Sequence, residues 1–365
     1  MKKILIALCA VATLASCTKN EVLSYDQEAI GFDNAFVDNS TRSVKDPSFS
    51  TSNMFSDFAV FGFVEGASVF DGVRVSKGGD ITNTELKQNW KYSGTQYWIA
   101  GANYAFYAIA PFSGDWDIKV DSTTTPTPTP IATATGATIT FTNDDGTQDL
   151  LYAGIVARKG EASGNAAVAL TFNHILSKVK FSFVNDYNAT SATICVRDIK
   201  ITNAYNTAEA ALASGAAWDE HDGAVEIAFG NATTDDDYAE YVLPAGGENA
   251  LANFDYASGN TVESYYERFV IPAPSKEWNI KFTVDLLVSG KLIKTYNHTA
   301  TLTTSFEPGK AYDITATIDA TNIDPATSQE PIEFTATMND WEDGDDENED
   351  RDATVVDNTP QQGNN

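Results

Sequence analysis

The residues with the clearest chemistry lie near the start of the chain, in the run Leu14-Ala15-Ser16-Cys17. It follows the basic Met1-Lys2-Lys3 and an uncharged apolar stretch, residues 4–14, that is too short to span a bilayer. Small side chains let a signal peptidase approach, and the cysteine thiol can then take a diacylglycerol group. The pattern predicts that residues 1–16 are a lipoprotein signal peptide, cleaved after Ser16, and that acyl chains such as palmitate on Cys17 anchor the protein. The alternative is an ordinary cleavage site beside an unmodified cysteine.

The remaining cysteines predict no disulfide within the mature chain. Cys9 leaves with the signal peptide and Cys17 is acylated, so Cys195 is left alone. Cys195 lies in the apolar, strand-like run 193–196. A buried structural thiol is therefore favoured over a nucleophile.

The sequence holds no motif that selects an enzymatic reaction. It has no nucleophile elbow, no glycine-rich phosphate loop and no cluster of metal-ligating residues. Two carboxylates could meet as in a glycosidase, but nothing indicates which two. The three histidines lie far apart, and His174 is predicted at a strand end with its ring satisfied by backbone. We expect no catalytic activity, no metal and no cofactor.

The charge of the chain makes nucleic acid a poor candidate partner. Lys and Arg number 23 against 51 Asp and Glu, a net charge of -28, which repels phosphate backbones. The stretch from Asp340 to Asp357 alone holds ten acidic residues and one Arg. Residues 342–365 are therefore predicted to be an acidic, disordered tail. A calcium loop at residues 343–347 is disfavoured because the alternating ligands and closing Glu are missing.

An aromatic-rich region occupies residues 90–107, with Trp90, Tyr92, Tyr97, Trp98, Tyr104 and Tyr107. Such side chains could stack sugars, or they could be core and sheet edge. Burial of Trp90, Trp98 and Trp116 would decide between the two interpretations, because a tryptophan in a core cannot stack a sugar.

Alternation of apolar and polar residues, the mark of half-buried strands, dominates the chain between leader and tail. It predicts an all-β fold, an antiparallel sandwich with many short strands. The predicted strands are 58–64, 69–75, 104–110, 137–142, 167–172, 175–185, 194–202, 280–286, 312–318 and 332–338.

Three segments qualify this pattern. The Ala-rich stretch 208–213 is the one plausible helix. The proline-rich run 121–130 predicts an exposed loop inserted within the first domain. The domain boundary is placed near residue 173, which gives an N-terminal β-sandwich over 43–172 and a C-terminal β-sandwich over 173–341.

Several motifs, in their order and spacing, resemble the fimbrillin-like lipoproteins of Bacteroides-type bacteria, which include the subunits of type V pili. They are Asp57-Phe58-Ala59-Val60-Phe61-Gly62-Phe63, Trp90-Lys91-Tyr92 with Tyr97-Trp98, residues 104–111, His174-Ile175-Leu176-Ser177-Lys178-Val179, residues 306–312 and Met338-Asn339-Asp340-Trp341. The resemblance implies two tandem transthyretin-like antiparallel β-sandwich domains in a lipoprotein of the outer membrane and cell surface.

The same resemblance implies a route of assembly. An Arg-specific protease removes an N-terminal strand from the lipidated precursor, and a donor strand from another fimbrial subunit fills the groove that is left. On this chain Arg42 and Ser43 match the processing site, residues 17–42 the lipidated segment, and Ile30 and Phe32 the removed strand. Arg42 could equally be one exposed arginine in a polar loop. Ser122, in Asp121-Ser122-Thr123, resembles an O-glycosylation site of such bacteria.

The C-terminal tail departs from the family pattern for a shaft subunit. Its apolar residues are confined to the run Ala353-Thr354-Val355-Val356, a short donor, since each buried Val contributes only about 1.5–3 kcal/mol. The sequence therefore predicts a structural subunit of an adhesive fimbria, with an accessory or tip role as open as a shaft role. The alternative is a monomeric surface lipoprotein that binds glycan or protein ligands of a host or bacterial surface.

Overall fold

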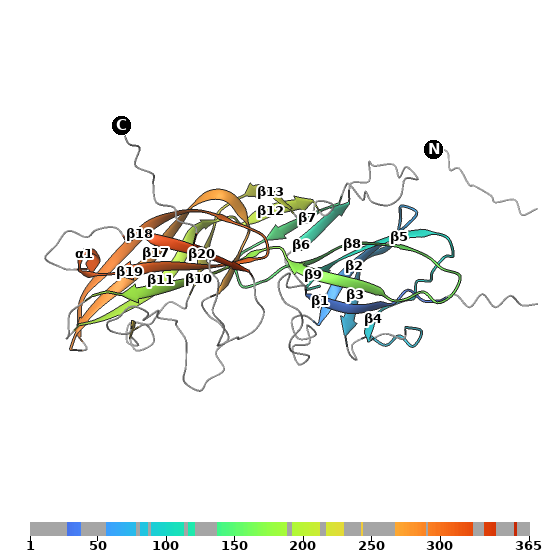
Figure 1. The fold of residues 1–365 in the computed structure, drawn as a ribbon, viewed down its shortest axis with the longest axis horizontal. Coiled ribbons are helices and arrows are strands. Elements are labelled where there is room, and N and C mark those ends of the chain that lie inside the picture. Colours follow the sequence, from blue (N-terminus) through green and yellow to red (C-terminus); the bar gives the residue numbers. More distant parts are fainter. Residues whose placement is uncertain are drawn as a thin grey trace, which may run out of the picture.

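The computed structural model describes residues 28–37, 56–77, 81–86, 89–112, 116–120, 137–187, 192–211, 217–229, 242–243, 267–289, 291–323, 332–340 and 354–355. These residues form β-strands and one short helix, α1 (Ala320–Ile323), which confirms the all-β class. The strands gather in two lobes along the long axis of the molecule, with β1 to β9 in one lobe and β10, β11 and β17 to β20 in the other (Figure 1). Within these residues no helix is long and apolar enough to cross a membrane.

The N-terminal lobe is built around a closed barrel. Its strands follow the order β1 (Phe32–Val37), β4 (Trp90–Tyr92), β3 (Ala67–Lys77), β2 (Asp57–Val64), β5 (Asn103–Ala110), β8 (Leu151–Lys159) and β9 (Val168–His174). β1 closes the ring, because it pairs with β4 on one side and with β9 on the other. The β1–β9 pairing is parallel, whereas the other pairings of this ring are antiparallel.

A four-stranded sheet takes strands from both halves of the chain. Its order is β13 (Ala217–Asp222), β12 (Thr207–Ala211), β7 (Ala137–Thr142) and β6 (Trp116–Val120). The predicted helix at 208–213 is therefore wrong, since residues 208–211 belong to β12. Ala208 and Ala210 face a core opposite Phe141 and Ile139 of β7, and this strand pairing overrides the helix propensity of alanine.

The C-terminal lobe is a sandwich of two sheets. One sheet has the order β16 (Arg268–Val270), β10 (Ser177–Asn185), β19 (Lys310–Ile318), β20 (Phe334–Asp340) and β21 (Thr354–Val355). The other has the order β14 (Val225–Ala228), β11 (Ala192–Ala204), β17 (Ala273–Val288) and β18 (Lys291–Phe306), with β15 (Val242–Leu243) also paired to β11. β10 and β19 run parallel, so each lobe departs once from the antiparallel expectation.

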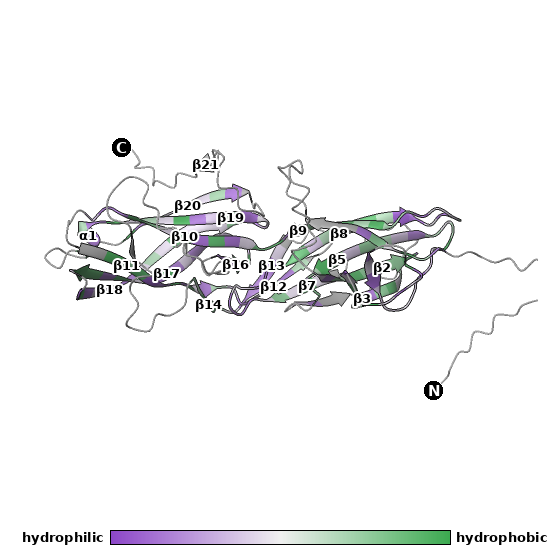
Figure 2. Ribbon diagram, turned by 90° about the horizontal axis from the view of Figure 1, so that it is seen from below, coloured by the Kyte–Doolittle hydropathy of each residue, from purple (hydrophilic) through white to green (hydrophobic). Residues whose placement is uncertain are grey.

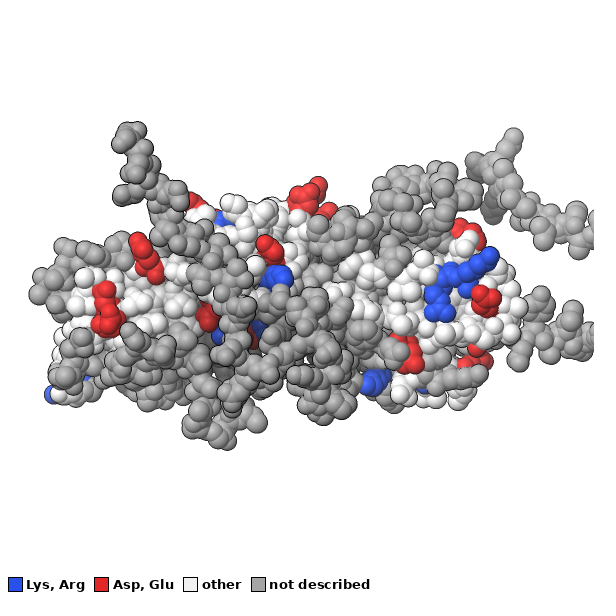
Figure 3. All heavy atoms as spheres, viewed as in Figure 1, with Lys and Arg blue, Asp and Glu red and all other residues white. Residues whose placement is uncertain are grey.

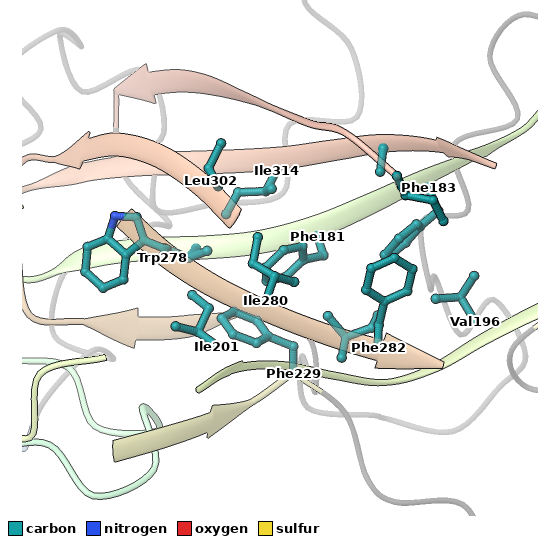
Figure 4. Packing of buried hydrophobic residues seen from close by; sticks show 14 of the residues in the cluster. Phe181, Phe183, Val196, Ile201, Phe229, Trp278, Ile280, Phe282, Leu302 and Ile314 are labelled. Carbon is teal, nitrogen blue, oxygen red and sulfur yellow. The ribbon is translucent and has the colours of Figure 1, made fainter. Parts of the chain in front are cut away.

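The core between these two sheets is apolar and rich in aromatic rings. Figure 4 shows Trp278, Ile280 and Phe282 on one strand, facing residues of the opposite sheet. Phe282 lies 5.4 Å from Phe183, ring centre to ring centre. Apolar and polar residues alternate along several strands in Figure 2, as the period of two in the sequence predicts.

The two lobes share a core and backbone hydrogen bonds where they meet. Ala59, Phe61 and Tyr107 of the barrel belong to the same apolar cluster as Ile175 and Leu176, which link the two lobes. The loop after β7 adds polar contacts to the strand β16: the Asn143 side-chain amide donates to the Phe269 carbonyl at 2.9 Å, and the Phe269 N–H donates to the Gly146 carbonyl at 2.8 Å. Gly146 is required there, because its φ is 73° and a Cβ would lie 2.8 Å from Ile227.

The predicted strands from 58–64 to 332–338 are all found, with their ends shifted by at most two residues except for 280–286, which is part of the much longer β17. The longest strand that the pattern missed is β18, whose inward residues Tyr296, Leu302 and Phe306 are separated by His298, Ala300 and Thr304. Because the inward-facing residues His298, Ala300 and Thr304 are only weakly apolar, the alternation of apolar and polar residues cannot be recognised in this part of the sequence. The chain still adopts a strand there because β18 pairs along the length of β17.

Replacing Phe282 by Ala should destabilise the C-terminal lobe by about 3–5 kcal/mol, because the change leaves a cavity between the sheets. Lys281→Ala, next to it on the exposed face of β17, is the matched control and should change the free energy of unfolding by less than about 0.5 kcal/mol. Urea denaturation of both variants measures the difference. Equal effects would show that the two sheets do not pack as described.

Candidate functional site

The candidate site is the position of the N-terminal strand in the barrel, which we call the β1 slot: the space between β4 and β9 that residues 28–37 occupy. Opposite Phe32 stand Trp90 of β4 and Val168 of β9. The pairing with β9 continues to Val37, which lies opposite Phe172. The slot is thus the place of one strand, β1, in a ring that the other six strands leave open at this point.

Residues 28–31, which precede β1 and lie at the entrance of the slot, are bound by backbone hydrogen bonds on both sides. The Ile30 N–H donates to the Gln96 carbonyl at 2.8 Å, and the Trp98 N–H donates to the Glu28 carbonyl at 2.9 Å. On the other side the Val168 N–H donates to the Gly31 carbonyl at 2.7 Å. These bonds use main-chain atoms alone, so they would accept any extended chain.

One side chain also donates a hydrogen bond to the backbone of this segment. The Tyr92 hydroxyl donates to the Ile30 carbonyl at 2.8 Å in a buried setting. Burial raises the pKa of Tyr92 to about 12, so the hydroxyl keeps its proton at physiological pH.

Phe32 fills the centre of the barrel. Its ring is fully buried and contacts four aromatic rings edge to face, with centroid separations of 5.5 to 6.3 Å. The four partners are Phe58, Phe70, Tyr92 and Phe106. Each such pair typically adds about 0.5–1.5 kcal/mol beyond area burial, so this one ring is a major part of the barrel core.

The predicted removed strand falls in this segment: Phe32 is the first residue of β1, Ile30 comes just before it, and both are buried, while removal of the segment remains a prediction. Ile30 and Phe32, two residues apart, both point into the barrel core. The segment contributes both main-chain hydrogen bonds and alternate apolar side chains. A molecule that makes the same contacts must therefore be another extended chain. The other predicted site residues, Ser16, Cys17, Arg42, Ser43 and Ser122, lie outside the described residues.

Within the C-terminal tail the structure describes two residues, Thr354 and Val355. These two residues form β21 and pair antiparallel with Met338 and Thr337 of β20. The apolar run of the tail therefore includes residues in an extended, strand-paired conformation at a sheet edge.

The aromatic-rich region is core rather than an exposed platform. Trp90 and Trp98 are each 4% exposed, and Tyr92, Tyr104 and Tyr107 are each 1% exposed. Trp116 is partly buried, and its indole N–H donates to the Pro111 carbonyl at 2.8 Å. Tyr97 is the exposed member of the group, and its hydroxyl bonds Glu85.

Among the described cysteine and histidine side chains, Cys195 and His174 are buried, and His221 and His298 are half-buried. Cys195 is fully buried, and burial raises the pKa of its thiol to about 12, which confirms the predicted buried thiol. The His174 Nδ1 lies 2.7 Å from the Asp149 carboxylate, a partner that the sequence did not predict. Burial lowers the pKa of His298. Among the described residues no three His, Cys, Asp or Glu side chains are grouped to hold a metal.

Comparison with known proteins gives a family match and structural neighbours. A family described as fimbrillin-like matches residues 41–341. A fimbrial protein from Bacteroides vulgatus has a similar fold, at 17% identity and a TM-score of 0.53, with 86% of this chain and 99% of that chain covered. A Bacteroides uniformis protein described as a putative cell adhesion protein has 17% identity and a TM-score of 0.44, with 87% and 99% covered. The search of curated proteins found no match.

Replacing Phe32 by Ala should destabilise the barrel by about 3–5 kcal/mol, because the centre of an aromatic cluster is emptied. Ile99→Ala, at an apolar position 55% exposed on the same lobe, is the control and should cost less than about 0.5 kcal/mol. Hydrogen exchange at the Val168 amide measures the local stability of the pairing between β9 and the N-terminal segment, because this amide donates to the Gly31 carbonyl. Unchanged exchange in Phe32→Ala would contradict the described position of β1.

The buried, protonated Cys195 thiol should resist modification. In a chain that begins at Thr18, a thiol reagent at pH 8 should react at least about 100-fold more slowly with folded than with urea-unfolded protein, because the reactive thiolate is disfavoured. Thr299→Cys places a thiol on the exposed face of β18 and should react rapidly in the folded state. Rapid modification of Cys195 in the folded protein would contradict its burial.

Proposed function

The chain belongs to the fimbrillin-like family, and on that premise we propose that it is a structural subunit of an adhesive cell-surface fimbria, joined to its neighbours by donor-strand addition. The observation that carries this proposal is the β1 slot. A strand close to the start of the chain completes the barrel through main-chain hydrogen bonds and one central aromatic ring, Phe32.

The slot supports a defined order of events. Lipidated Cys17 anchors the precursor to the outer membrane, and proteolysis between Arg42 and Ser43 follows export. Arg42 comes five positions after Val37, the last residue of β1. Cleavage there leaves β1 held by non-covalent contacts alone, so the strand can leave and be replaced.

The proposed donor is the tail run Ala353-Thr354-Val355-Val356 of a neighbouring subunit. Support comes from β21, since Thr354 and Val355 already pair as a strand with an edge of the sandwich. The pairing of these two residues supports the proposal, because strand addition needs a run that exchanges main-chain hydrogen bonds with a sheet edge. The donor has no aromatic residue to match Phe32, which favours an accessory or tip subunit over a shaft subunit.

A monomeric glycan-binding lipoprotein is less well supported. That function needs an exposed aromatic platform, and Trp90 and Trp98 are buried in the barrel core. We therefore assign adhesion to the assembled fimbria, with other subunits as the main partners and no catalytic role.

The experiment is to separate sheared surface polymers from the membrane fraction of native cells and to determine the N-terminus of this protein in each. The proposal expects chains that begin at Ser43 in the polymer fraction. Arg42→Ala should reduce the polymer-fraction protein at least about tenfold and leave lipidated chains that begin at Cys17 in the membrane. Lys45→Ala, a cation in the same segment, should assemble normally. Polymer-fraction Arg42→Ala at the wild-type level would overturn the proposed processing.

A further inference from the structure

A carboxylate lies at the entrance of the β1 slot and is bound by a preorganised pair of N–H donors. The Asn165 backbone N–H donates to the Glu28 carboxylate at 2.6 Å, and the Asn165 side-chain amide donates to the same oxygen at 3.2 Å. The side-chain amide is fixed from the other side, because it also exchanges hydrogen bonds with the backbone of Glu161 at 2.8 and 3.0 Å. Both donors therefore stay directed at the slot entrance whether or not Glu28 is present.

Glu28 belongs to the segment that the proposed processing removes. Its loss would leave Asn165 with two donors and no acceptor, while the loop from β8 to β9 that holds Asn165 remains. Hydrogen bonds to a charged group are worth more than those to neutral groups. The vacated position would select a chain that brings a carboxylate.

Two basic residues at the end of β8 lie on the side of Asn165 at this entrance. Arg158 donates to the carbonyls of Ala166 and Ala167, next to Asn165, and lies over the ring of Trp98. Lys159 is its neighbour on β8. Figure 3 shows basic side chains gathered toward the outer end of this lobe.

The cations near the slot have few carboxylate partners. In the described part of the chain no carboxylate lies within ion-pair distance of Arg158 or Lys159. Two acidic side chains of this lobe already accept hydrogen bonds, Glu65 from Asn103 and Glu85 from Tyr97. Departure of Glu28 removes one negative charge and makes the region more attractive to an acidic chain.

We propose that Asn165 is a carboxylate-recognition position for the tail of a second copy of this chain, and that Asp352 takes the place of Glu28. This inference rests on the proposed donor-strand function. Asp352 precedes Val356 by the same four positions by which Glu28 precedes Phe32. The register therefore places Thr354 at the position of Ile30 and Val356 at the position of Phe32.

The order of residues in the tail also sets the direction of the donor. The acidic residues of 340–352 come before the apolar run, so only a donor parallel to β9, like β1 itself, places them at Asn165 and Arg158. An antiparallel donor would bring them to the other end of the slot, near Phe172. A valine fills less of the Phe32 site than phenylalanine does, so recognition of Asp352 compensates for a weaker apolar contact.

The test uses the full mature chain, nicked between Arg42 and Ser43 by an Arg-specific protease, and a fluorescent peptide of residues 340–365. Fluorescence anisotropy measures peptide affinity. Asp352→Asn in the peptide should weaken binding about tenfold or more, whereas Asp343→Asn, the same change nine residues earlier, should weaken it less than about threefold. The fold of the acceptor is untouched by either change.

An acceptor variant completes a double-mutant cycle. On Asn165→Ala protein the additional effect of Asp352→Asn should disappear. If Asp352→Asn binds wild-type acceptor as tightly as the unchanged peptide does, the carboxylate inference is overturned and donor-strand addition stands. If the unchanged peptide does not bind nicked protein at all, donor-strand addition by this tail fails, and the inference fails with it.

Discussion

Closure of the barrel by β1 is the constraint on which the N-terminal lobe depends. A sheet with open edges exposes unpaired N–H and C=O groups, and closing the ring removes both edges at once. Here one segment satisfies β4 and β9 together, and its Phe32 ring occupies the space between four aromatic residues. Loss of this segment would expose a polar ladder and an apolar cavity in the same place, and an incoming strand would satisfy both.

The two lobes are joined by more than a linker. β12 and β13 follow the first C-terminal strands in sequence, yet they extend the sheet that β6 and β7 begin. The cluster around Phe61 and Tyr107 of the barrel includes Leu176 and Ile271 from beyond residue 173. The two lobes are therefore connected by a common core and by main-chain hydrogen bonds.

Charge and packing have separate roles at the β1 slot. Main-chain pairing and aromatic burial supply affinity that almost any extended apolar chain could use, so they discriminate poorly between donors. The Asn165 donors and the neighbouring Arg158 add a requirement for a carboxylate at one position. Under the proposed donor-strand addition, in a chain with a net charge of -28, such a site would distinguish a correctly aligned tail from one that is shifted or reversed.

The sequence by itself determined the all-β class, the buried Cys195 and the apolar character of Ile30 and Phe32, because period-two alternation and hydrophobicity are local properties. It could not assign β12 as a strand, since Ala208 and Ala210 become core only when β7 lies beside them. It could not find Glu28 and Asn165 either, because 137 positions separate them. Only the tertiary structure decided that β1 closes a ring and where its carboxylate binds, since both depend on pairings between distant segments that no local pattern encodes.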